Sequence, residues 1–137
     1  MSAESDYIQA EIESILQTSN MIHDLLKKEI LSKYETIALG KLLQDIYTGI
    51  ERIIRNKLES LDIKTIKNHS WHKEMLLAAK ENAVVTQQQF EEFRKLLVFR
   101  HLQIHGYGYM LDEQRLRELA GPVPAVCRDF IQFITGS

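Results

Sequence analysis

The sequence predicts an all-α protein: an antiparallel four-helix bundle with a short extra helix and a C-terminal helix broken by proline. Prolines occur only at Pro122 and Pro124, so a long stretch lacks the residue that most reliably breaks helices. Apolar residues recur at three- and four-residue steps in several segments, and no segment alternates as a strand does. The length suits one domain, which we place at residues 1–137.

Two long amphipathic helices are expected in the first half of the chain, over residues 3–28 and 34–61. Gly40 and Gly49 weaken the second by about 1 kcal/mol each relative to alanine, so tight packing against a neighbour is the expected reason for them. The expected inward residues are Ile8, Ile12, Ile15, Leu16, Ser19, Ile22 and Leu26 in the first helix, and Leu39, Leu42, Leu43, Ile46, Ile50, Ile53, Ile54 and Leu61 in the second.

The second half is expected to hold a connector and shorter helices. Residues 62–70 lack a helical period, and Ser70 is a suitable cap for a short helix over 71–80. Thr86 and Gln89 fit a capping box at the start of a third main helix. Glycines after residue 105 favour its end, and a fourth helix is expected from Asp112, broken at residues 121–124. The expected inward residues are Phe90, Phe93, Leu96, Leu97, Ile104, Leu116, Leu119, Val126, Phe130 and Ile134.

Composition and charge limit the functional classes. The net charge of −2 argues against a broad surface that neutralises phosphates, so no DNA is expected and any RNA contact is local. No apolar run approaches the roughly 18 to 20 residues of a membrane span, and the polar start lacks a signal peptide, which favours a cytoplasmic protein without membrane contact. The lone Cys127 is expected to be a buried apolar residue.

Arg100 and His105 are the candidate catalytic residues. Arginine is a permanently charged fork suited to a phosphate, and histidine exchanges protons near neutral pH. The ribose 2′-OH is an internal nucleophile, so this pair suffices for RNA cleavage without a metal. On one ideal helix the two side chains would point about 140° apart. Either the helix ends between them, or they act from opposite subunits of a dimer.

Other histidines offer weaker signals. His101 and His105 are four residues apart, the spacing at which two imidazoles bind one metal ion. No carboxylate has a compelling position as a third ligand, so no metal site is expected. His69 and His72 flank Trp71 in the connector, where side chains facing solvent or bonded to the backbone are the simpler expectation.

Tyrosines and one carboxylate are possible supporting residues. Tyr107 and Tyr109 lie in a glycine-rich turn, where each either packs at the rim of the core, stacks on a base or is covalently modified. Asp45 and Tyr47 lie on the second helix. Asp45 is either a solvated surface residue or, with Tyr47, part of the partner that orients His105 or Arg100.

The motif resembles that of a known family. The R-x4-H-x-Y motif of the HepT-like toxins of the HEPN superfamily is matched by Arg100, His105 and Tyr107. Four residues separate the first two, and one residue separates the last two. The segments 45–52, 70–72, 99–101 and 107–112 also look like sequence blocks of one branch of that family. Many members have asparagine after the motif arginine, where this chain has His101.

The resemblance implies a four-helix bundle whose homodimer brings two motifs to a shared cleft, and a metal-independent endoribonuclease toxin that needs no cofactor. It also implies a partner, a minimal nucleotidyltransferase antitoxin that uses ATP to transfer AMP to Tyr107. Two alternatives stay open. One is a non-catalytic, nucleotide-binding partner of a nucleotidyltransferase, and the other is a structural helical dimer whose motif is incidental.

Overall fold

The computed structural model describes residues 3–64, 71–105 and 112–136, which form six α-helices and no strand. The all-α prediction is therefore confirmed. None of the helices in these ranges combines the length and the apolar character that crossing a membrane requires. The helices are α1 (Ala3–Leu26), α2 (Lys33–Ser60), α3 (Trp71–Glu81), α4 (Gln87–Ile104), α5 (Glu113–Ala120) and α6 (Val123–Thr135).

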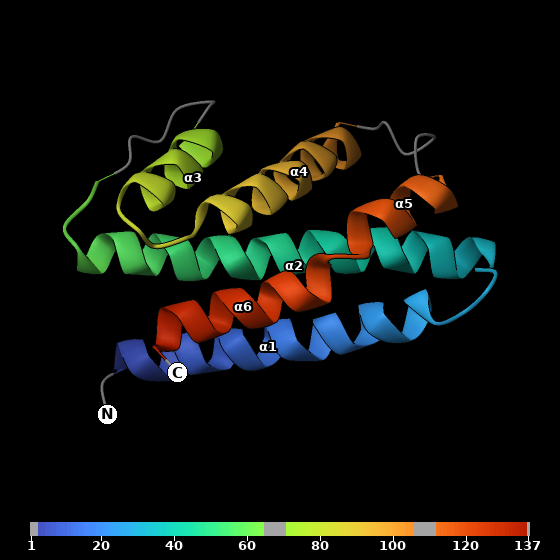
Figure 1. The fold of residues 1–137 in the computed structure, drawn as a ribbon, viewed down its shortest axis with the longest axis horizontal. Helices are drawn as coiled ribbons and strands as arrows, with labels where there is room; N and C mark the ends of the chain where they lie inside the picture. Colours follow the sequence, from blue (N-terminus) through green and yellow to red (C-terminus); the bar gives the residue numbers. More distant parts are fainter. Residues whose placement is uncertain (1–2, 65–70, 106–111, 137) are drawn as a thin grey trace.

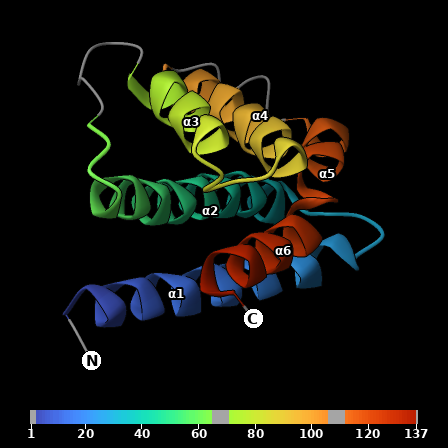
Figure 2. The ribbon, with the colours of Figure 1, turned by 60° about the vertical axis from the view of Figure 1, so that its left-hand side comes forward.

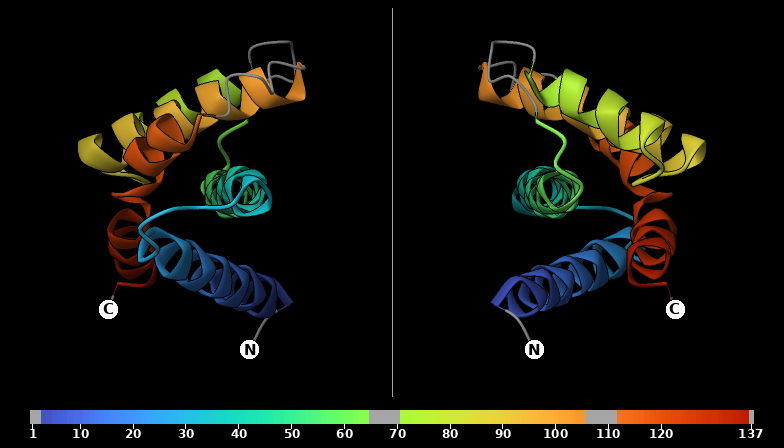
Figure 3. Two further views of the ribbon diagram at one scale, coloured as in Figure 1. Left: turned by 90° about the vertical axis from the view of Figure 1, so that its right-hand side faces the viewer. Right: turned by 90° about the vertical axis from the view of Figure 1, so that its left-hand side faces the viewer.

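Helix α2 lies at the centre of the bundle. Figures 1 and 2 show it between α1 and α6 on one side and α3 and α4 on the other. The four long helices α1, α2, α4 and α6 alternate in direction, as in an antiparallel bundle. Seen end-on in Figure 3, α1 and the α3–α4 pair flank α2, and α5 and α6 close one side. Because it has neighbours on several sides, α2 supplies much of the core.

Two of the helices begin at capping boxes. The Ser32 side chain accepts from the Glu35 backbone at 3.1 Å, and the Glu35 carboxylate accepts from the Ser32 backbone at 2.9 Å. Thr86 and Gln89 form the same pair of bonds at 3.1 and 3.0 Å, which confirms the predicted box at the start of α4. Asp112 occupies the N-cap of α5 as expected but makes no capping hydrogen bond through its side chain.

The predicted break near the C-terminus is also present. Helix α5 ends at Ala120, and α6 begins at Val123 with Pro122 at its N-cap. A proline is tolerated there because the first backbone N–H groups of a helix have no partner within it. Helix α6 ends at Thr135, and its C-cap is Gly136, whose φ of 72° is a left-handed conformation that glycine adopts without strain.

Three residues expected in the core are exposed instead. Leu16 is 39% exposed, Leu61 is 55% exposed and Ile104 is 59% exposed. Leu16 lies about 100° around α1 from the buried Ile15, past the edge of the face that packs. Leu61 and Ile104 lie at the ends of α2 and α4. The apolar period continues to these positions, but no neighbouring helix in the described ranges covers their side chains.

Gly49 marks a close approach between α1 and α2. A Cβ at this position would lie 2.9 Å from Cγ1 of Ile15, a buried side chain of α1. The expectation that tight packing accounts for Gly49 is therefore confirmed. Cys127 is buried in α6 as expected, and burial raises the pKa of its thiol to about 12, so at neutral pH it stays an apolar thiol.

Candidate active site at the C-terminal end of α4

The end of α4 carries the candidate catalytic residues. The helix ends at Ile104, and His105 occupies its C-cap, so the helix end falls between Arg100 and His105 as one alternative predicted. A side-chain hydrogen bond from Gln44 of α2 to Gln103 attaches this last turn to the bundle. This contact joins Gln103, which lies between Arg100 and His105, to α2.

Arg100 lies over an aromatic ring of α2. Its guanidinium carbon is 6.0 Å from the centre of the Tyr47 ring, a cation–π distance. Tyr47 is fully buried, and burial, followed by the nearby charge of Glu51, raises the pKa of its hydroxyl above the ordinary range. Tyr47 therefore contacts Arg100 as a neutral residue and is itself buried.

Glu51 of α2, near Tyr47, is hydrogen-bonded to His72 of α3. Glu51 is 8% exposed, and its Oε2 lies 2.6 Å from Nδ1 of His72, which is hydrogen-bonded to it. The ring centres of His72 and Trp71 are 3.9 Å apart. Side chains from three helices therefore form one series, from Arg100 over Tyr47 and past Glu51 to His72.

His101 and His105 lie side by side on the exposed face. Their ring centres are 4.3 Å apart and the rings are tilted by 48°. Arg100 points toward α2, whereas the two imidazoles face outward, so the arginine and His105 have different neighbours within one chain. Among the described residues, no group of three side chains of the kinds that bind metals surrounds this pair.

The other candidate residues are placed as follows. Asp45 is exposed on α2, and its carboxylate is 2.7 Å from Nζ of Lys41, in the same helix. The acidic residue beside Tyr47 is therefore Glu51, and a supporting role for Asp45 stays a prediction. Tyr107 and Tyr109 lie outside the described residues.

Several nearby cations are used for structure. Arg117 of α5 donates to the Lys28 carbonyl at 2.7 Å and to the Glu113 carboxylate at 3.0 Å, which ties α5 to the end of α1. Lys95 pairs with Glu92 at 3.1 Å. Arg117 and Lys95 are thus engaged in contacts within the chain, whereas Arg100 and the two histidines lie together at the end of α4.

Chemically, this site offers a fixed cation and two proton-exchanging groups in reach of solvent. An arginine held by an aromatic ring is preorganised for a phosphate, and exposed imidazoles near a helix end exchange protons with a bound ligand. Such a set is compatible with acid–base chemistry at a phosphodiester.

Residues 38–135 match the model of a family described as HepT-like protein. The chain belongs to the HepT-like family. The matched range holds most of α2, all of α3 to α6 and every candidate residue. Membership therefore agrees with the resemblance noted from the sequence and makes the chain a HEPN-type protein. No curated protein shows significant similarity to the chain.

A solved structure supports the HepT-like chain's fold. The structure of a cytosolic protein of unknown function, YutE from Bacillus subtilis, is similar with a TM-score of 0.71. The two chains are 18% identical, and the similarity covers 93% of this chain and 88% of that one. At that identity the likeness shows a shared helical fold and says nothing of activity.

Sequence reasoning missed the Glu51–His72 pair. His72 was expected to face solvent or bond to the backbone, and it bonds to a buried carboxylate instead. One signal was available, because Glu51 lies four residues after Tyr47 and shares its face of α2. That His72 is the partner of Glu51 could not be predicted from the sequence, because the connector between α2 and α3 has no periodic pattern.

Proposed function

We propose that this HepT-like protein is a metal-independent endoribonuclease toxin. The observation that carries the proposal is the exposed end of α4, where Arg100 lies over Tyr47 and His105 lies against His101, in a chain of this family. The 2′-OH of the ribose attacks the adjacent phosphorus, and the 5′-oxygen of the next nucleotide leaves. His105 moves the protons, and Arg100 stabilises the charge on the phosphorane-like transition state.

We also propose that the site works as two copies across a homodimer. Within one chain, Arg100 and His105 have different neighbours, whereas a shared cleft would bring together the arginines and imidazoles of two chains. Such a cleft concentrates positive charge locally, which suits a chain with a net charge of −2.

The proposal is tested by cleavage of RNA in EDTA. We expect His105→Ala to lower the rate by about 10²- to 10⁴-fold, the usual contribution of acid–base catalysis. His23→Ala is the matched control, because His23 is an exposed histidine of α1 outside the site. Equal cleavage by wild type and His105→Ala, after repurification of both, would remove the proposal.

Regulation by modification is proposed with it. A nucleotidyltransferase antitoxin would transfer AMP from ATP to the Tyr107 hydroxyl and release pyrophosphate. Incubation with ATP and that enzyme should add the mass of at least one AMP to wild type and none to Tyr107→Phe. An unchanged wild-type mass with an active enzyme would contradict this. A tight complex without RNA cleavage would favour the non-catalytic binding partner.

A further inference from the structure

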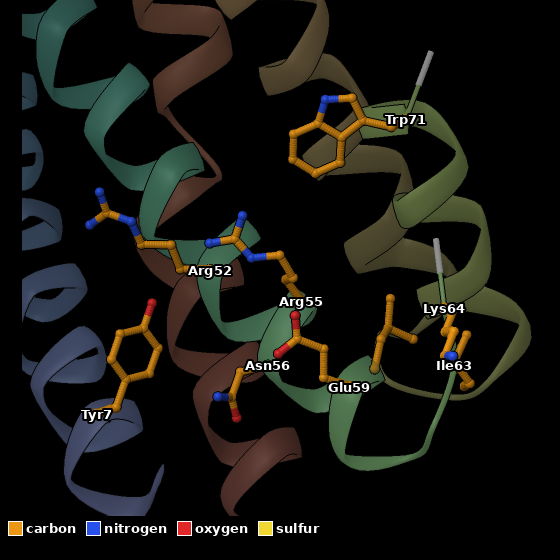
Figure 4. A pocket seen from close by; sticks show the side chains of 9 residues that line it. Tyr7, Arg52, Arg55, Asn56, Glu59, Ile63, Lys64 and Trp71 are labelled. Carbon is orange, nitrogen blue, oxygen red and sulfur yellow. The ribbon is translucent and has the colours of Figure 1, made fainter. Parts of the chain in front are cut away.

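A cavity of about 690 Å³ lies where α1, α2 and the start of α3 meet. Figure 4 shows its lining, in which the Arg55 side chain extends between those of Arg52 and Trp71. None of the candidate catalytic residues belongs to this lining. The residues that line the cavity are Tyr7, Arg52, Arg55, Asn56, Leu58, Glu59, Ile63, Lys64 and Trp71.

The cavity carries more positive than negative charge. Among the described residues of the lining, Arg52, Arg55 and Lys64 are cations and Glu59 is the one carboxylate. Arg52 is partly neutralised by Glu11, at 3.3 Å. Within the described part of the chain, Arg55 and Lys64 make no side-chain ion pair, so both are available to a bound anion.

Aromatic and amide groups complete the lining. Trp71 is half-buried and borders the cavity from α3, and Tyr7 borders it from α1. Asn56 borders the cavity from α2. A flat aromatic surface and cations without an ion pair among the described residues are the groups that recognise a base and its phosphate.

We propose that this cavity binds a nucleoside phosphate, with the base against Trp71 and the phosphate on Arg55 and Lys64. The ligand is either one nucleotide of an RNA strand or a free nucleotide. The RNA source rests on the proposed ribonuclease function, and there the cavity would be a subsite that positions the strand.

The place of the cavity on α2 favours the RNA source. Tyr47, beneath Arg100, and Arg55 lie eight residues apart on α2, which corresponds to about 12 Å along the axis. A few nucleotides of single-stranded RNA span that distance. A strand held at Arg55 would therefore reach the end of α4.

Intrinsic fluorescence tests the proposal, because Trp71 is the protein's one tryptophan. The experiment uses the full-length His105→Ala protein and two probes, AMP and a short RNA with 2′-O-methyl groups that cannot be cleaved. We expect saturable quenching of Trp71, and roughly tenfold weaker binding in Arg55→Ala and in Lys64→Ala, as befits one lost charge-assisted contact. Arg128→Ala, an exposed cation of α6 outside the lining, should bind within about twofold of its parent.

The two sources are separated by comparing the probes. Tighter binding of the RNA than of AMP indicates a subsite of the strand, and equal or tighter binding of AMP indicates a free-nucleotide site. Inorganic phosphate should compete with either probe. No quenching by either probe, or the same loss in Arg128→Ala as in Arg55→Ala, would overturn the proposal. Melting temperatures of the variants identify any that fail to fold, and Lys64→Ala then remains as an exposed, independent test.

This binding assay is independent of cleavage. An active ribonuclease whose binding is unchanged by Arg55→Ala would contradict the cavity alone. Binding to the cavity without any cleavage by wild type would contradict the ribonuclease alone.

Discussion

Helix α2 packs differently on its two sides. Toward α1 the close contact is largely apolar, with Gly49 facing the buried Ile15, and the Arg52–Glu11 ion pair spans the same two helices. Toward α3 and α4, apolar packing is joined by two polar pairs: Gln44 bonds to Gln103, and Glu51 bonds to His72. Both sides belong to one continuous helix, so the difference lies in the side chains and not in the backbone.

The apolar contact and the polar pairs contribute differently to stability and to the geometry of the candidate site. Apolar packing stabilises in proportion to the surface it buries, and it places no group in a particular orientation. Buried polar pairs contribute less net stability, because desolvation offsets much of the attraction, but their geometry is directional. We infer that the α1 side holds the fold together and that the α3–α4 side orients the candidate site.

The largest expected effect is on the apolar side. Ile15→Ala removes a buried side chain from the α1–α2 contact and leaves a cavity, which should lower the free energy of unfolding by about 2–5 kcal/mol. Urea unfolding measures this change. Leu16→Ala is the neighbouring control, because Leu16 is 39% exposed and its loss should cost far less. Similar costs for the two variants would contradict the division between the sides of α2.

Gly49→Ala should have the next largest effect on the free energy of unfolding. Alanine favours a helix by about 1 kcal/mol over glycine, but its Cβ would lie 2.9 Å from Ile15 Cγ1. Ile15 is buried and stiff at its branched Cβ, so we expect a net destabilisation of about 1–3 kcal/mol.

A double-mutant cycle sharpens this prediction. In Ile15→Ala/Gly49→Ala the opposing atom is gone and the new methyl group partly fills the space. The double variant should therefore be more stable than the sum of the two single costs predicts. Additive costs in urea unfolding would show that the close approach does not constrain Gly49.

Glu51→Gln tests the polar side. The substitution keeps the shape but removes the charge that faces His72 and Tyr47, and it should cost about 1–3 kcal/mol of stability. If this series of contacts holds Arg100, RNA cleavage should also fall when assayed well below the melting temperature of the variant. Glu81→Gln, an exposed glutamate of α3, is the control and should change neither property. Full activity in folded Glu51→Gln would assign Glu51 a structural role alone.

The sequence alone predicted most of the helical framework, because its signals are local. The signals for the capping box of Thr86 and Gln89, for the break at the prolines and for close packing at Gly49 each lie within a short stretch of the chain. Residues were wrongly expected in the core where the apolar period of a helix continues beyond the helix that packs against it. Leu61 and Ile104 continue an apolar period beyond the end of the packed surface.

The candidate site was only partly predictable for the same reason. Arg100 and His105 were chosen from residue chemistry and spacing, and the structure places both at the end of α4. Their support comes from residues far apart in sequence, such as Gln44 and Gln103, and no periodicity encodes that contact. The cavity at Arg55 is likewise assembled from three helices, so its residues were not distinguishable from a solvated face.

The smallest expected effect lies at the corner where α1 leads into α2. The hydrogen bond from Lys28, and then that from the Ser32 backbone, lower the pKa of Glu35 from 4.5 to about 2. Because the folded-state pKa is the lower one, the carboxylate stabilises the fold fully above about pH 4.5, and this contribution is lost as the pH falls toward 2. Glu35→Gln should therefore flatten the pH dependence of thermal stability in that range.

The same variant keeps the capping box, because a glutamine carbonyl can accept from the Ser32 backbone as Gln89 accepts from Thr86 in α4. At neutral pH we accordingly expect only a small change in melting temperature, from the lost attraction to Lys28. A large loss at neutral pH would mean that this charged corner, and not the apolar contact at Gly49, holds α1 against α2. An unchanged acid profile would mean that Glu35 is not paired in solution.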